Sequence, residues 1–298
     1  MIARLFVALT DRSPGMRRWL WQRWYQFLAR YRVGEWTFMN YGFADSASLE
    51  LRTEDEDDRY CAQLYHVVAS AVPLAGKGVL EVGSGRGGGA AFVAAYLKPA
   101  SMLGVDYSPR AVAFCQSRHT ADNLRFQAGD AEALPIADAS MDAVLNVESS
   151  HCYGSMPRFL AEVKRVLRPG GHFLYADFRA ATELDAWEQQ LVDSGLETLE
   201  SDDITTRVVN AMTADHDRKA QLIGGMFQRP VFASLQVCEV RKSITLSYLA
   251  TLSTGATCCE KRRNQADVTD SIDRSSRTKP PRSTPMARMT DSLKSSRA

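Results

Sequence analysis

The chain has 298 residues, a formal net charge of +1, an apolar fraction of 45% and a charged fraction of 24%. These values are typical of a globular protein with one large domain or slightly more, and the near-neutral charge excludes a general electrostatic attraction to nucleic acid. No apolar run reaches the roughly 18 residues of a transmembrane helix, and Asp11 and Arg12 break the apolar start of the chain early, so we expect neither a membrane span nor a secretion signal.

Residues 1–60 are rich in aromatic and basic side chains. Within residues 16–32, tryptophan, tyrosine and leucine recur at helical spacing with arginines around them, which predicts an amphipathic helix. We interpret residues 1–60 as a helical cap. The helix has either a structural or a functional role. In the structural role it packs on the main domain; in the functional role it covers an apolar substrate or rests on a membrane surface. The aromatic stretch "WTFMNYGF" (36–43) follows, and it either closes over a ligand or fills an edge of the core.

Residues 61–255 alternate strand-like and helix-like segments. The strand-like segments are 78–83, 101–108, 124–131, 141–149 and 171–178, and the helix-like segments are 88–97, 109–119, 156–167 and 182–196. Ser108 opens the helix over 109–119, with Pro109 at its first position. Strands that alternate with helices predict an α/β fold with a doubly wound, mostly parallel sheet. Such sheets bind ligands beyond the carboxyl ends of their strands, where the strand order reverses.

Residues 256–298 are rich in Ser, Arg, Pro and Thr and contain no aromatic residue. Such a segment buries too little apolar surface to offset the entropy lost on ordering, so we expect a basic, disordered tail. Six cysteines are spread along the whole chain without CxxC spacing. We therefore expect reduced thiols, a cytoplasmic protein and no zinc site.

The glycine-rich stretch "LEVGSGRGGG" (80–89) follows a buried strand, and Gly83, Gly85 and Gly88 fit the G-x-G-x-x-G pattern of dinucleotide sites. Glu81, however, stands two residues before the first glycine, where its carboxylate would repel a pyrophosphate. A ligand with a cationic end fits this loop better. S-adenosylmethionine carries an ammonium and a sulfonium group and no phosphate, and NAD stays as the alternative cofactor.

Further polar residues stand at the ends of the next strands. Asp106 ends the second strand, where a carboxylate accepts hydrogen bonds from both ribose hydroxyls, a role that NAD sites share. Asp130 and the Ala131 N–H follow the third strand, in position for the adenine edge. The predicted cofactor-binding residues are Glu81, Gly83, Gly85, Gly87, Asp106, Tyr107, Asp130, Ala131 and Asn146.

Four ordered motifs make this chain resemble the class I S-adenosylmethionine-dependent methyltransferases. They are "LEVGSGRGG", "GVDYS", "GDAEALPIADASMDAVLNVES" and "RVLRPGGHFLYAD", and the resemblance covers roughly residues 64–179. More narrowly, "NYGF", "NVESSHCY" and "RFLAEVKRVLRPGG" are similar to the mycobacterial phthiotriol/phenolphthiotriol dimycocerosates methyltransferases and related fatty-acid methyltransferases. The resemblance implies methyl transfer from S-adenosylmethionine to a hydroxyl of a long-chain lipid, with a fatty-acid carboxylate as the alternative acceptor.

Three polar residues near the expected methyl group are candidates for the chemistry. His151, just beyond the fourth strand, is predicted as the general base, because histidine titrates near neutral pH and the segment is similar to the E-S-x-H stretch of sugar O-methyltransferases; the alternative is a structural histidine. Asp177, at the end of the fifth strand, either orients His151, contacts the acceptor or caps the next element. Glu148 either holds the amino end of the cofactor or fixes its loop. We expect no metal, because no acidic cluster resembles a cation site.

The chain departs from the family pattern near its C-terminus. Family members usually end in a strand pair with an aromatic, glycine-containing segment, whereas "TLSTGATCCEKRRNQ" (251–265) leads here into the basic tail. We therefore expect the last strand to be lost, which leaves open a protein that binds the cofactor without turnover. Nucleic acid is not the expected substrate, because "NVES" replaces the (N/D)PP(Y/F) type of segment and the domain has no basic stripe.

Overall fold

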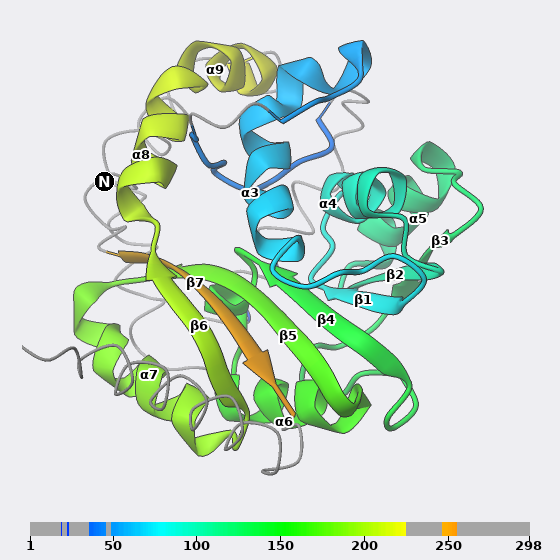
Figure 1. Ribbon diagram of the computed structural model, residues 1–298. Helices are drawn as coiled ribbons and strands as arrows, with labels where there is room; N and C mark the ends of the chain where they lie inside the picture. Colours follow the sequence, from blue (N-terminus) through cyan, green and yellow to red (C-terminus); the bar gives the residue numbers. More distant parts are fainter. Residues whose placement is uncertain (1–18, 20–22, 24–35, 46–48, 225–245, 255–298) are drawn as a thin grey trace, which may run out of the picture. The chain divides into compact units, whose positions relative to one another are not determined.

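The computed structural model of the protein describes Trp19, Arg23 and residues 36–45, 49–224 and 246–254. In these ranges the chain forms a single seven-stranded sheet with helices on both of its faces (Figure 1). The predicted N-terminal helix, apart from Trp19 and Arg23, and the predicted disordered tail lie outside the described residues.

The sheet has the strand order β3-β2-β1-β4-β5-β7-β6. Its strands are β1 (Gly78–Val82), β2 (Ser101–Asp106), β3 (Leu124–Ala128), β4 (Met141–Val147), β5 (Leu167–Arg179), β6 (Glu197–Asp203) and β7 (Leu246–Ser253). Strands β1 to β5 pair in parallel, and β7 is antiparallel to both β5 and β6. The predicted doubly wound, mostly parallel sheet is confirmed, and its strand order reverses between β1 and β4.

The helices connect these strands. They are α3 (Arg59–Ala69), α4 (Gly88–Phe92), α5 (Pro109–Arg118), α6 (Met156–Val166), α7 (Leu184–Asp193), α8 (Thr205–Ala214) and α9 (His216–Gly224), with short turns η1 (Thr53–Asp58), η2 (Val93–Leu97), η3 (Ser150–Cys152) and η4 (Ala181–Glu183). As predicted, Ser108 opens α5 and Pro109 occupies its first turn; the Ser108 hydroxyl accepts the Ala111 N–H at 3.4 Å.

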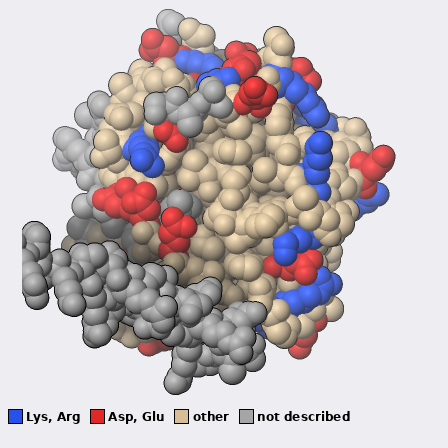
Figure 2. Space-filling model, viewed as in Figure 1, with Lys and Arg blue, Asp and Glu red and all other residues tan. Residues whose placement is uncertain are grey.

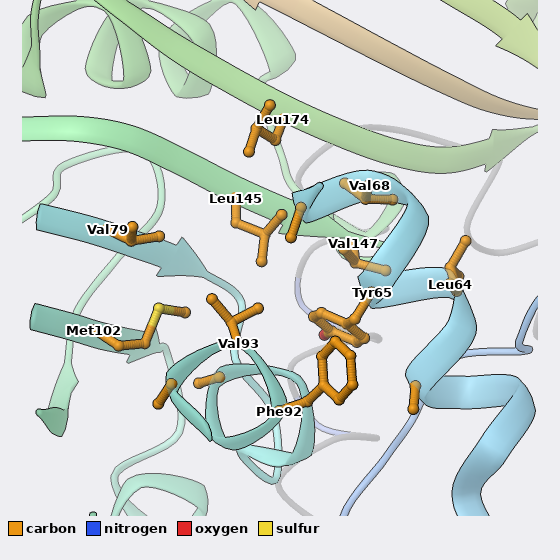
Figure 3. Close-up of a cluster of buried hydrophobic side chains, with 14 of the residues drawn as sticks. Leu64, Tyr65, Val68, Val79, Phe92, Val93, Met102, Leu145, Val147 and Leu174 are labelled. Atoms are coloured by element: carbon orange, nitrogen blue, oxygen red, sulfur yellow. The ribbon is translucent and has the colours of Figure 1, made fainter. Parts of the chain in front are cut away.

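Alternate side chains of the central strands point to opposite faces of the sheet and pack in two hydrophobic cores, one on each face. Val79 of β1 and Leu145 of β4 face α3 and α4 (Figure 3), whereas their neighbours Leu80 and Val144 face α6 and α7. All four side chains are fully buried. A strand buried on both faces reads as a continuous apolar run, which is why "GVLEV" and "AVLNV" identified β1 and β4 in the sequence.

Strand β7 corrects the expectation that the last strand is lost. It lies between β5 and β6, where Ala250 is opposite Tyr175 on one side and Ser201 on the other. Leu252 is fully buried against the α6 and α7 face. The family sheet is therefore complete despite the unusual sequence that follows it. Strand β5 also begins earlier than predicted, because Leu167 already pairs with Met141 across a bulge.

The surface in Figure 2 carries acidic and basic residues side by side around a broad uncharged area. The described residues on this face form no continuous basic stripe of the kind that follows a nucleic-acid backbone. No helix in the described ranges is long and apolar enough to cross a membrane.

Replacement of Leu145 by alanine tests the central position of β4. Leu145 is fully buried between β1 and β5, so we expect the L145A variant to lose about 2–5 kcal/mol of unfolding free energy through lost burial and a cavity. Urea unfolding followed by circular dichroism measures this loss. The matched control is Val192→Ala, at a side chain that is 67% exposed, which should change stability by less than about 0.5 kcal/mol. Equal losses in both variants would contradict this account of the core.

Candidate active site

A cavity lies at the carboxyl ends of β1, β2, β3 and β4, beside the reversal of strand order. Its position is the one that doubly wound sheets use for ligands. It is lined by the glycine loop, the ends of β2 and β3, the turn after β4, residues 37–40, and residues of α3 and α5. The polar and small residues that line it include Ser84, Gly85, Asp106, Tyr107, Asp130, Ala131, Asn40, Glu148, Cys152 and Tyr153.

The glycine loop is tied to β2 by its backbone. The N–H groups of Gly83 and Ser84 both donate to the Val105 carbonyl, at 2.7 and 3.0 Å. Gly83 has φ of 79°, and a Cβ there would overlap the Ser149 hydroxyl, so only glycine fits. Gly87 has φ of 80° and caps the start of α4; a Cβ there would collide with Phe126, and Gly87 does not line the cavity.

Asp106 is held at the cavity wall by two backbone donors. Its Oδ2 accepts the Gly85 N–H and its Oδ1 accepts the Ser108 N–H, both at 2.8 Å. Burial raises its pKa to about 6, and these two hydrogen bonds oppose that rise. The structure thus brings Asp106 and Gly85, both predicted as cofactor residues, into direct contact on the cavity wall.

The predicted adenine end is also assembled at the cavity. Tyr107 lines it with a side chain that is 47% exposed, and Asp130 and Ala131 line it from the end of β3. Asp130 accepts the Glu132 N–H at 3.0 Å through Oδ1, which shapes this turn. The exposed Tyr107 ring and the small Ala131 side chain both line this part of the cavity, which suits a flat ligand group.

Two predicted cofactor residues lie behind the wall instead of on it. Glu81 is fully buried and accepts the Tyr65 hydroxyl at 2.6 Å; burial raises its pKa to about 7, although the Tyr65 hydrogen bond lowers it. Asn146 is also fully buried and donates to the Val82 carbonyl at 2.8 Å and to the Tyr153 hydroxyl at 3.1 Å. Neither side chain lines the cavity, so both support residues that do.

His151 and Asp177 form a hydrogen-bonded pair. His151 Nδ1 lies 2.8 Å from Asp177 Oδ1, and the His151 N–H donates to Oδ2 at 3.0 Å. Burial raises the pKa of Asp177, but Arg179 and His151 outweigh it and hold that pKa well below its usual range. Burial lowers the pKa of His151, but Cys152 and Asp177 outweigh it and raise that pKa to about 10. The pair therefore favours the imidazolium form.

The His151 ring lies behind Cys152, which lines the cavity. His151 itself is not among the lining residues, but Cys152 is, and the Cys152 side chain hydrogen-bonds with His151. The ring also packs against Phe178 with a centroid distance of 4.3 Å. Asp177, Cys152 and Phe178 together fix the orientation of the imidazole next to the end of the cavity.

Glu148 lines the same end of the cavity in an unusual backbone conformation. Its φ is 46°, in the left-handed region that non-glycine residues rarely adopt. The Tyr41 N–H donates to Glu148 Oε2 at 2.8 Å. Burial raises the pKa of Glu148 to about 7, and the Tyr41 hydrogen bond opposes that rise.

Residues 36–43 divide between the cavity and the core. Residues 37–40 line the cavity, while Phe43 is fully buried in the core. Arg86 of the glycine loop was missed. Its Nε donates to the Trp36 carbonyl, and its guanidinium lies 4.0 Å from the centre of the Phe114 ring. The sequence signal for Arg86 was an arginine among the small residues of the glycine loop. A ligand without a phosphate does not require a cation there, so this arginine needed another explanation, such as its contact with an aromatic ring.

No group of three or more His, Cys, Asp or Glu residues in the described ranges is arranged to hold a metal ion.

Comparison with known proteins identifies related chains. A family profile described as a methyltransferase domain matches residues 80–175. The chain is 44% identical over 196 residues to a probable phthiotriol/phenolphthiotriol dimycocerosates methyltransferase 2 of Mycobacterium ulcerans, covering 65% of this chain and 76% of the relative. It is 43% identical over 190 residues to a fatty-acid O-methyltransferase of Mycolicibacterium smegmatis, covering 63% and 69%.

The fold is also found among solved structures. A geranyl diphosphate C-methyltransferase of Streptomyces coelicolor, in complex with S-adenosyl-L-homocysteine, superposes with a TM-score of 0.58 at 15% identity, covering 78% of this chain and 98% of that one. At this identity the likeness supports the shared fold alone.

Replacement of Asp106 by asparagine tests the cofactor end of the cavity. Asparagine keeps the shape but removes the charge that would accept two ribose hydroxyls, so we expect the affinity for S-adenosylhomocysteine to fall about 10- to 100-fold. Isothermal titration calorimetry measures this loss, with NAD as the control ligand and Asp122→Asn, an exposed carboxylate, as the control variant. Unchanged affinity in D106N would remove Asp106 from the cofactor site.

Proposed function

Because the chain belongs to the S-adenosylmethionine-dependent methyltransferases, in the group that includes the phthiotriol/phenolphthiotriol dimycocerosates methyltransferases, we propose that it methylates a hydroxyl of a long-chain lipid. S-adenosylmethionine is its cofactor, and the chain is a methyltransferase. The observation that supports the hydroxyl acceptor most directly is the His151–Asp177 pair beside the end of the cofactor cavity.

The residues of the cavity fit this cofactor. Asp106 presents a carboxylate to a diol, and Tyr107 and Ala131 leave space for a flat base. The Ser84 hydroxyl is buried on the glycine loop and has no hydrogen-bond partner in the described part of the chain, so a polar ligand group would satisfy it. When bound, the cofactor supplies a methyl group on a positively charged sulfur, which an oxygen nucleophile attacks in line.

The protein contributes orientation, exclusion of water and removal of a proton. Residues 37–40 and the Phe114 ring line the cavity and limit the access of water to it. In the proposed role, His151 Nδ1 stays bonded to Asp177 Oδ1 and Nε2 takes the proton of the acceptor hydroxyl. Asp177 then stabilises the imidazolium that forms, because its carboxylate lies 2.8 Å from Nδ1.

Two acceptor classes follow from the names of the relatives. The phthiotriol-type relatives point to a hydroxyl acceptor, and the Mycolicibacterium smegmatis relative points to a fatty-acid carboxylate. We favour the hydroxyl, because a carboxylate needs no base and the buried His151–Asp177 pair would then have no role. The arginine-rich aromatic pattern of residues 16–32 supports a contact with a membrane surface, and we propose that the enzyme works there from the cytoplasm.

Replacement of His151 by alanine tests the base. We expect H151A to bind S-adenosylhomocysteine as the wild type does, because His151 does not line the cofactor cavity, and to lose roughly 10²- to 10⁴-fold in kcat. Transfer of a labelled methyl group to a lipid alcohol measures kcat. The matched control is His66→Ala, at a partly exposed histidine of α3. Wild-type turnover in H151A would make His151 structural.

The dependence of kcat on pH tests the role of Asp177. The active form of the base is neutral imidazole, so activity rises with pH and levels off above the His151 pKa, which is raised to about 10. Asp177→Asn removes a charge that raises this pKa, so the inflection should move to lower pH while the maximal rate falls. A pH–rate profile of both proteins makes the comparison. An inflection at the same pH in D177N would show that Asp177 does not set the pKa of the base.

A further inference from the structure

The end of the cavity next to His151 contains several hydrogen-bond donors that are already engaged within the protein. The Tyr41 N–H donates to Glu148, and Asn40 Nδ2 donates to the Cys61 carbonyl at 3.0 Å. In the turn after β4, the N–H groups of Cys152 and Tyr153 donate to the carbonyls of Ser149 and Ser150, at 3.1 and 3.0 Å. These donors are therefore not available to a ligand without breaking the structure.

Two residues at this end, Asn40 and Glu148, present acceptor oxygens that a ligand can still use. Asn40 is 5% exposed and lines the cavity, and its Oδ1 is buried with no hydrogen-bond partner in the described ranges. Glu148 also lines the cavity, and within the described ranges its carboxylate accepts one hydrogen bond, from the Tyr41 N–H at Oε2. Asn40 and Tyr41 are consecutive residues, so the two acceptors belong to one corner of the cavity.

Both acceptors are held in place. Lys219 Nζ of α9 donates to the carbonyls of Asn40 and Tyr41, at 3.2 and 2.9 Å, and fixes the backbone of this corner. The Glu148 N–H donates to the Ala176 carbonyl at 2.7 Å, which holds the left-handed residue against β5. A strained residue kept beside a cavity by such contacts is typical of a functional position.

We propose that Asn40 and Glu148 form a hydroxyl-recognition site that selects an alcohol over a carboxylate as the methyl acceptor. An alcohol supplies the O–H donor that these oxygens lack, whereas a carboxylate supplies only acceptors and a negative charge. Sites with unpaired buried acceptors reject ligands that leave them unpaired. This inference rests on the proposed lipid O-methylation and decides between its two acceptor classes.

The nearby charges do not offset the repulsion of a carboxylate. Any charge that His151 carries as an imidazolium is matched by Asp177, which lies 2.8 Å from it. Lys219 forms an ion pair with Asp215 at 3.3 Å as well as holding the two carbonyls. Arg86 lines the cavity with its guanidinium against Phe114 and bonded to Trp36. Each of these cations is thus engaged by partners of its own.

The cofactor ammonium is a second donor that could occupy Glu148, and the experiment separates it from the acceptor hydroxyl. Full-length wild type and the Glu148→Gln variant are assayed for labelled methyl transfer to stearyl alcohol and to stearate in the same detergent micelles. In parallel, calorimetry measures the binding of S-adenosylhomocysteine to each protein. The exposed Glu200→Gln of β6 is the matched control.

We expect the wild type to have a kcat/KM for stearyl alcohol about 100-fold above that for stearate, and E148Q to reduce this ratio about tenfold with unchanged cofactor affinity. E200Q should behave as the wild type. Asn40→Ala should reduce the same ratio, which keeps the test informative if E148Q folds poorly.

Three results would overturn the proposal. The first is a wild type that prefers stearate. The second is an E148Q variant that loses cofactor affinity and keeps its acceptor ratio, which would assign Glu148 to the ammonium. The third is transfer to neither lipid by a protein that binds the cofactor, which would overturn the proposed lipid O-methylation and this inference with it.

Discussion

The buried carboxylate of Asp177 is the interaction on which the arrangement of the active site depends. It lies at the end of β5 with 2% exposure and receives the Ser150 hydroxyl at 2.6 Å, the backbone N–H and Nδ1 of His151, and the Arg179 guanidinium at 3.2 Å. Removing a carboxylate from water costs several kcal/mol, and this set of donors offsets the cost only in one geometry. The turn after β4 is therefore fixed, and with it the positions of Glu148 and Cys152 at the cavity.

The same turn links the acceptor end of the cavity to the cofactor end. Ser149 packs where Gly83 lacks a Cβ, and its hydroxyl lies 2.7 Å from that of Tyr153. Asn146 joins Tyr153 to the Val82 carbonyl at the start of the glycine loop. One continuous wall of hydrogen bonds thus runs from β1 to the turn after β4. Buried Asn146 thus connects the two ends of the cavity without lining it.

The sequence predicted the elements whose signal is local. The five parallel strands and their helices were placed to within a few residues, because a strand such as "GVLEV" is apolar along its whole length and a cap such as Ser108 acts on its own helix. Strand β7 was missed because its partners, β5 and β6, are distant in the sequence and specify it by pairing. The roles of Asn40 and Glu148 depend on a contact across 107 residues, between Tyr41 and Glu148, which no spacing pattern reveals.

The two carboxylates beside His151 show how environment assigns different chemistry to similar groups. Asp177 lies against Arg179, and its pKa is held well below the usual range. Burial raises the pKa of Glu148 to about 7, and the charges of Lys219 and His151 oppose that rise without cancelling it. Arg179 is 8% exposed and reaches Asp177 from a site packed against Trp187, away from the cavity lining. The fold alone does not determine the acceptor, since the same sheet supports many reactions. In this site the Asp177 carboxylate contacts His151, while the Glu148 carboxyl group lines the cavity.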